Sequence, residues 1–169
     1  MSEPLKLNIG CGSLRFPGEI GIDKFPTEAS DLVLDFLDGL PYEDNSVDQV
    51  RFEHILEHLP FRQSPRAVLE IFRVLKPGGT LLLGVPDLQK TASAFLEASS
   101  LQEKVLLVRQ LYGSQSHLGE YHQSGWDSEM ITHLLSSVGF SSIVVSPDLE
   151  KDLWEASLSV TAVKPGSIE

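Results

Sequence analysis

The chain has 169 residues, of which 41% are hydrophobic and 22% charged, a balance typical of a globular domain. The 24 acidic residues outnumber the 13 basic ones and give a net charge of −11, which disfavours nucleic acid as a partner because an acidic surface repels phosphates. The single cysteine excludes an intramolecular disulfide, and no apolar run approaches the roughly 18 residues of a membrane span. We therefore expect one soluble, cytoplasmic domain over residues 1–169, without a signal peptide or contact with a membrane.

The apolar patterning predicts strands and helices in alternation. Strands are expected over residues 5–10, 19–23, 31–36, 47–52, 80–85, 140–146 and 153–163. Helices are expected over residues 65–75, 88–112 and 127–136, and a polar loop over 114–125. Such alternation indicates a mostly parallel sheet with right-handed crossovers.

The first glycine turn points to a ligand. An apolar run ends in Gly10-Cys11-Gly12, and a second run ends at Asp23. Glycine has no Cβ, so the backbone can turn sharply at the strand end and approach a ligand, while the acid can accept hydrogen bonds from ribose hydroxyls. The pattern predicts a pocket for an adenosine-containing cofactor.

The details disfavour a dinucleotide. Arg15 stands where the third glycine of the dinucleotide fingerprint would fall, and Asp23 follows Gly12 after 11 residues, whereas the fingerprint expects roughly 20. Pro17 and Gly18 leave room for a very short first helix at most, so little helix N-terminus is available to stabilise a pyrophosphate. A ligand without phosphates fits better, and a dinucleotide-dependent oxidoreductase is the disfavoured alternative.

Four segments occur in an order typical of one family. They are residues 8–13 (NIGCGS), 40–48 (LPYEDNSVD), 55–59 (ILEHL) and 73–80 (RVLKPGGT). Together they resemble the S-adenosylmethionine-dependent methyltransferases of the Rossmann-like type (class I), close to the type 11 group. The resemblance implies a three-layer α/β sandwich whose mostly parallel, seven-stranded sheet has a reversed C-terminal edge strand, here with a truncated first helix.

The resemblance also implies which residues bind S-adenosylmethionine. The methionine part would lie over the glycine turn, the ribose on Asp23 and the adenine near Asp35. The implied cofactor-binding residues are Asn8, Gly10, Cys11, Gly12, Asp23, Asp35, Phe36, Leu37 and Glu53. From the residues alone, Cys11 fits a small packing residue better than a reactive thiol, and Asp23 and Asp35 can equally be acids that serve strand ends and turns.

The methyl acceptor should lie beyond the carboxyl ends of the central strands, here near residues 53–58. If that segment is helical, His54, Glu57 and His58 share one face. A histidine there could act as a base. The face could instead bind a divalent metal, as in family members with a related Glu-x-x-Glu-His motif and a later histidine, here His122. Hydrogen bonding to neighbouring backbone is preferred for Glu57 and His58, and we assign no metal ligand.

Residues 113–126 combine glycines, aromatic residues and His122 in a polar segment. They form either a movable lid over the substrate or a surface loop whose Trp126 packs against the sheet. We assign His122 as the general base, with His54 and His58 as further catalytic candidates.

The sequence thus predicts a methyltransferase that uses S-adenosylmethionine, gives S-adenosylhomocysteine, and acts on an oxygen or nitrogen of a small molecule or sugar. Because the chain is short, the acceptor pocket should be shallow or completed by a second subunit, for example in a homodimer. The alternative is a cofactor- or partner-binding protein of the same fold without transferase activity.

Overall fold

Strand β1 (Lys6–Ile9) lies near the middle of a seven-stranded sheet with the order β3-β2-β1-β4-β5-β7-β6. The computed structural model describes residues 3–116, 119–147 and 156–166. The other strands are β2 (Glu19–Asp23), β3 (Leu32–Val33), β4 (Val47–Glu53), β5 (Leu75–Pro86), β6 (Ser141–Pro147) and β7 (Ser157–Val163). The strands β1 to β5 pair in parallel, and β7 runs antiparallel to both of its neighbours. The expected mostly parallel sheet with a reversed C-terminal strand is confirmed, and β7 lies one position in from the edge strand β6.

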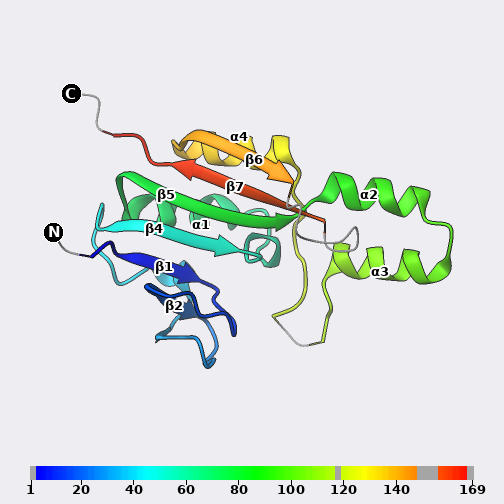
Figure 1. The fold of residues 1–169 in the computed structure, drawn as a ribbon, viewed down its shortest axis with the longest axis horizontal. Helices are drawn as coiled ribbons and strands as arrows, with labels where there is room; N and C mark the ends of the chain where they lie inside the picture. Colours follow the sequence, from blue (N-terminus) through cyan, green and yellow to red (C-terminus); the bar gives the residue numbers. More distant parts are fainter. Residues whose placement is uncertain (1–2, 117–118, 148–155, 167–169) are drawn as a thin grey trace.

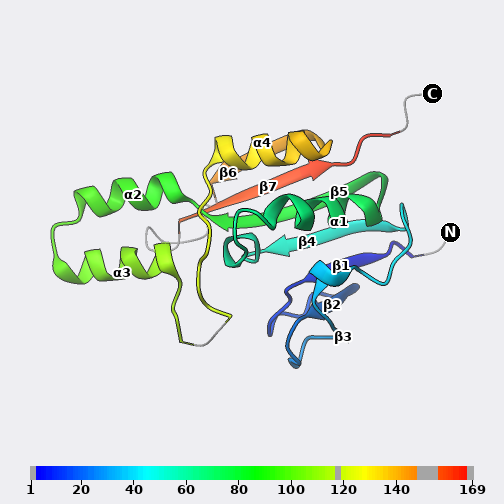
Figure 2. The same ribbon diagram turned by 180° about the vertical axis from the view of Figure 1, so that it is seen from behind.

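Helices α1 (Ser64–Val74) and α4 (Ser128–Val138) cover the same face of the sheet (Figures 1 and 2). Helix α1 turns its apolar side inward, where Val68 and Ile71 are buried. They join a core that includes Phe52 of β4 and Leu83 of β5. Burial of these side chains stabilises the fold by about 1.5–3 kcal/mol each.

The opposite face of the sheet is polar. On β4, Gln49, Arg51 and Glu53 alternate with the buried Val50 and Phe52. Parallel sheets usually have apolar side chains on both faces and helices over each. Here the described residues place no helix over the second face, because turns and strands alone connect β1 to β3. The truncation of the first helix is therefore confirmed. In the described residues, the helices that cover the sheet lie on one of its two faces.

The predicted helix over residues 88–112 is two helices, α2 (Leu88–Glu97) and α3 (Leu101–Tyr112). Ser100 begins α3: its hydroxyl accepts from the Glu103 amide, and the Glu103 carboxylate accepts from the Ser100 amide. This capping box ends the run that periodicity alone would continue. The two helices form a hairpin that projects beyond the end of β5 (Figure 1). In the described parts of the chain, no helix has both the length and the apolar character needed to cross a membrane.

Candidate functional site

The glycine turn after β1 has the left-handed backbone that glycine permits. The φ angles are +72° at Gly10 and +51° at Gly12. A Cβ at Gly10 would overlap the Ile55 side chain, which would have to shift to make room for it. At Gly12, in contrast, no heavy atom of the described residues lies within 4 Å of a Cβ position. The turn therefore has one packed glycine and one that borders open space.

Asp23, at the end of β2, holds this turn. One carboxylate oxygen accepts from the Gly12 amide at 2.9 Å, and the other accepts from the Phe25 amide at 2.9 Å. The amides of Gly10 and Cys11 both donate to the Ile22 carbonyl. The backbone donors of the turn thus join β1 to β2, and Asp23 is the charged group beside the open space at Gly12.

The side chains of Asn8 and Cys11 support the turn from within. Asn8 is buried and its side-chain amide donates to the Leu14 carbonyl at 3.2 Å. Cys11 is also buried, its Sγ would lie 3.1 Å from a Cβ on Gly21, and burial raises the pKa of its thiol. The side chains of Asn8 and Cys11 therefore serve packing. Only the backbone of these two residues could face a cofactor.

The third predicted strand, over residues 31–36, is mostly replaced by a turn, since β3 contains two residues and a 3₁₀ turn, η1, covers Phe36–Asp38. Asp35 caps that turn by accepting from the Leu37 amide at 3.1 Å, and it pairs with Lys24 at 2.8 Å. The Phe36 ring packs edge-on against Phe52, with ring centroids 5.4 Å apart. Of the residues expected near adenine, Asp35 therefore presents a charged side chain and Phe36 is a core residue.

Strand β4 ends at Glu53, whose carboxylate pairs with Arg51 at 2.9 Å. The next residue, His54, has a φ of +56°, an uncommon conformation for a side-chain-bearing residue. Such strain is often found at functional sites. It turns the chain into η2 (Leu56–His58), a 3₁₀ turn. The helix proposed for this segment is thus a single turn that begins after His54.

The turn still brings His54 and Glu57 together. His54 Nδ1 lies 3.2 Å from Glu57 Oε1. The Glu57 side chain is buried, with 2% of its area exposed. Among the described residues, Glu57 Oε2 has no hydrogen-bond partner. A buried carboxylate oxygen without a donor is costly and needs an explanation.

His122 is held against this turn by its own segment of chain. The backbone amides of Gln123 and Ser124 donate to the Glu57 carbonyl at 2.7 and 3.1 Å. His122 Nδ1 lies 2.9 Å from the Gln110 carbonyl, an acceptor, so Nδ1 carries the proton and Nε2 has the lone pair of the neutral ring. Burial lowers the pKa of His122, against the opposing charge of Glu57, so the ring is neutral at pH 7.

Trp126, at the end of this segment, is buried and its Nε1 donates to the Ser124 hydroxyl at 3.0 Å. Its ring also contacts Phe61 edge-on. The packing of Trp126 fits the second interpretation of this segment, a surface loop with a packed tryptophan, over residues 122–126. Residues 117–118 of the predicted loop lie outside the residues that the structure describes.

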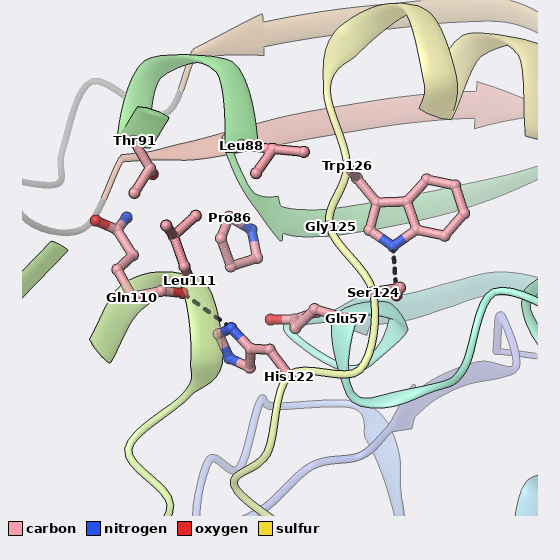
Figure 3. A pocket seen from close by; sticks show the side chains of 10 residues that line it. All are labelled: Glu57, Pro86, Leu88, Thr91, Gln110, Leu111, His122, Ser124, Gly125 and Trp126. Carbon is pink, nitrogen blue, oxygen red and sulfur yellow. Dashed lines mark hydrogen bonds between the residues drawn. The ribbon is translucent and has the colours of Figure 1, made fainter. Parts of the chain in front are cut away.

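A small pocket lies where these elements meet (Figure 3). A small space that is partly open to solvent is bordered by η2, the end of β5, both helices of the hairpin and the segment around His122. Figure 3 shows the Glu57 carboxylate turned toward His122. The sequence analysis missed Thr91 and Gln110, which also line the pocket. Their positions depend on the hairpin, and the Ser100–Glu103 capping box was the signal that could have revealed it.

The comparisons with known proteins agree with the fold. A family model described as a methyltransferase domain matches residues 22–83. A methyltransferase of Thermotoga maritima, described as dependent on S-adenosylmethionine, superposes with a TM-score of 0.66 and 20% identity, over 97% of this chain and 84% of the other. One from Archaeoglobus fulgidus gives 0.65 and 15%, over 95% and 86%. An uncharacterized 37.1 kDa protein in transposon Tn4556 of Streptomyces fradiae is 44% identical over 48 residues, which span 28% of this chain and only 13% of that protein.

Proposed function

We propose that this chain is a Rossmann-like (class I) S-adenosylmethionine-dependent methyltransferase, close to the type 11 group, and that it methylates an oxygen or nitrogen of a small molecule or sugar. The residues at the ends of β1 and β2 fit the cofactor. Gly12 borders open space, and Asp23 stands beside it as the acceptor for ribose hydroxyls. When bound, S-adenosylmethionine supplies a methyl group on a sulfonium, and the sulfur keeps the bonding electron pair to give S-adenosylhomocysteine.

One segment connects the cofactor end of the sheet to the pocket. Ile55 lies on Gly10 of the glycine turn, and Glu57, two residues later, lines the pocket. This continuity supports the pocket around His122 as the place for the acceptor. In such an arrangement the chain would hold the acceptor close to the methyl group and aligned with it, which is the main requirement of an in-line displacement.

The observation that carries the proposal is a set of acceptor atoms around the pocket. Glu57 Oε2 and Gln110 Oε1 are buried without a hydrogen-bond partner among the described residues, and both residues line the pocket. His122 adds the lone pair of Nε2. A ligand that donates hydrogen bonds, through a hydroxyl or an amine, complements these atoms.

The acceptor loses a proton as it gains the methyl group, and we assign this role to the histidine side of the pocket. His122 lies in the pocket itself, with His58 against it at a ring-centroid distance of 5.0 Å and His54 hydrogen-bonded to Glu57. As a neutral ring, His122 can take the proton on Nε2 and become a cation that the nearby Glu57 carboxylate stabilises.

The proposal is tested by titration with S-adenosylmethionine in a calorimeter, followed by incubation with a panel of hydroxylated compounds, amines and sugars. We expect micromolar binding and release of S-adenosylhomocysteine with a member of the panel. Binding without release in any class of acceptor would favour the alternative of a cofactor- or partner-binding protein. Absence of binding would contradict the proposed methyltransferase and favour a partner-binding protein of the same fold.

A further inference from the structure

Three side chains with metal-ligating atoms converge beside the pocket. Glu57, His58 and His122 can each offer one ligand atom so that all three atoms lie within 4.8 Å of one another. Two of these residues come from the turn after β4, and the third comes from the segment after α3. Their proximity therefore comes from the tertiary fold.

The two imidazole rings are oriented by backbone carbonyls. His58 Nδ1 lies 3.2 Å from the Tyr121 carbonyl, and His122 Nδ1 lies 2.9 Å from the Gln110 carbonyl. A carbonyl oxygen only accepts, so each Nδ1 carries a proton and each Nε2 has a lone pair. Histidines that bind metals usually donate their other ring N–H to a carbonyl or carboxylate in this way.

The buried carboxylate is an independent sign of a ligand. Glu57 has 2% of its side-chain area exposed, and its Oε1 is engaged by His54. Its Oε2 has no partner in the described parts of the chain. A cation next to Oε2 would satisfy this oxygen and offset the cost of burying a negative charge.

The cluster is also fixed before any ligand arrives. The Gln123 amide donates to the Glu57 carbonyl, and the Gln123 side chain donates to the His58 carbonyl at 2.8 Å. These bonds join the two segments that carry the ligating side chains. A site held in place in this way loses less entropy when it binds.

We propose that Glu57, His58 and His122 bind a divalent transition-metal ion such as Zn²⁺, with a coordination position left for water or for an oxygen of the acceptor. Two imidazoles and one carboxylate are a donor set typical of zinc sites that keep an open position. The role of the ion rests on the proposed function, whereas its binding does not. Held by Glu57, His58 and His122, the ion would supply a Lewis acid that lowers the pKa of an acceptor hydroxyl. In the ion-bound protein, His122 acts on the acceptor through the ion.

The test uses the whole chain, stripped of metal with a chelator and titrated with Co²⁺ while visible absorption is recorded, then with Zn²⁺ in a calorimeter. We expect one ion per chain and absorption bands of Co²⁺ bound to nitrogen and oxygen. Glu57→Gln and His122→Ala should each weaken binding by at least about 100-fold, and His54→Gln, which alters a positioning contact, by about tenfold. The exposed His133 on α4 is the matched control, and His133→Ala should bind as the parent does.

The folding of each variant is checked by thermal unfolding of the metal-free protein. Glu57→Gln keeps the shape of the side chain and removes a buried charge, so it should melt no lower than the parent. Binding that is absent, or equal in the parent, Glu57→Gln and His122→Ala, would overturn the site. Titration of the metal-free chain with S-adenosylmethionine separates the two proposals: metal binding without cofactor binding would contradict the proposed function alone, and the reverse would contradict the metal site alone.

Discussion

The carboxylate of Asp23 accepts a hydrogen bond from the Gly12 amide at 2.9 Å and so ties the end of β2 to the turn after β1. The residue expected to bind ribose is therefore also a support of the glycine turn. Removing it should affect both the cofactor and the local backbone, and the two effects need to be measured separately.

Asp23→Ala should weaken S-adenosylmethionine binding by more than about tenfold, because a hydrogen bond to a charged acceptor contributes about 1.5–3 kcal/mol. Calorimetry measures this change. Asp31→Ala is the matched control, since Asp31 also accepts from a backbone amide, that of Gly21 at 2.8 Å. It should lower the melting temperature to a similar extent and leave binding intact. Equal affinity of Asp23→Ala and the parent would remove Asp23 from the proposed cofactor site.

Gly12→Ala and Gly10→Ala should have different consequences. Both place a side chain in the left-handed region, at a cost of about 1–2 kcal/mol. At Gly12 the new methyl group enters open space, so the protein should fold and bind S-adenosylmethionine poorly. At Gly10 it would overlap Ile55, so the protein should lose more stability than Gly12→Ala does. Denaturant unfolding and calorimetry on both variants check this, and unchanged cofactor affinity in Gly12→Ala would place the cofactor elsewhere.

His122→Ala should lower turnover by about 10²–10⁴-fold once an acceptor is identified, because the pocket loses its neutral imidazole. Affinity for S-adenosylmethionine should stay the same, since His122 lies at the pocket proposed for the acceptor and away from the glycine turn. The exposed His133 supplies the control variant, His133→Ala, with full turnover. Full turnover in His122→Ala would contradict the assignment.

Glu70 and Arg73 on α1 make stability depend on pH. Their ion pair holds the pKa of Glu70 below its ordinary 4.5, with the Leu40 amide as a further donor. Since the unfolded chain binds this proton more readily, the stabilisation is complete above pH 4.5 and is lost as the pH falls through the lower folded pKa. Glu70→Gln should cost about 1.5–3 kcal/mol at neutral pH and weaken the acid dependence of unfolding. Chemical unfolding across pH 3–7 measures both, with the exposed Glu97→Gln as a control that should leave the curve unchanged.

The elements with strong local signals could be predicted from the sequence. Apolar runs ending in Gly10-Cys11-Gly12 and at Asp23 indicated neighbouring strands with a turn between them, and the structure pairs β1 with β2 in parallel. Pro17 and Gly18 correctly predicted the truncated first helix. These features depend on backbone preferences of a few adjacent residues, which a sequence states directly. The break between α2 and α3 also has a local signal, the Ser100–Glu103 capping box. Helical periodicity continues across this break and therefore predicts one helix over residues 88–112.

The sequence alone determined the parallel sheet, the glycine turn and the acid at the end of β2, because strand period and glycine conformation are short-range properties. Only the tertiary structure decided that Glu57 is buried and faces His122, 65 positions later in the chain. That proximity depends on how the α2–α3 hairpin returns the chain to η2 and on the bonds from Gln123 to Glu57 and His58. Long-range packing of this kind leaves no periodic trace in the sequence, so the pocket proposed for the acceptor became visible only in the folded chain.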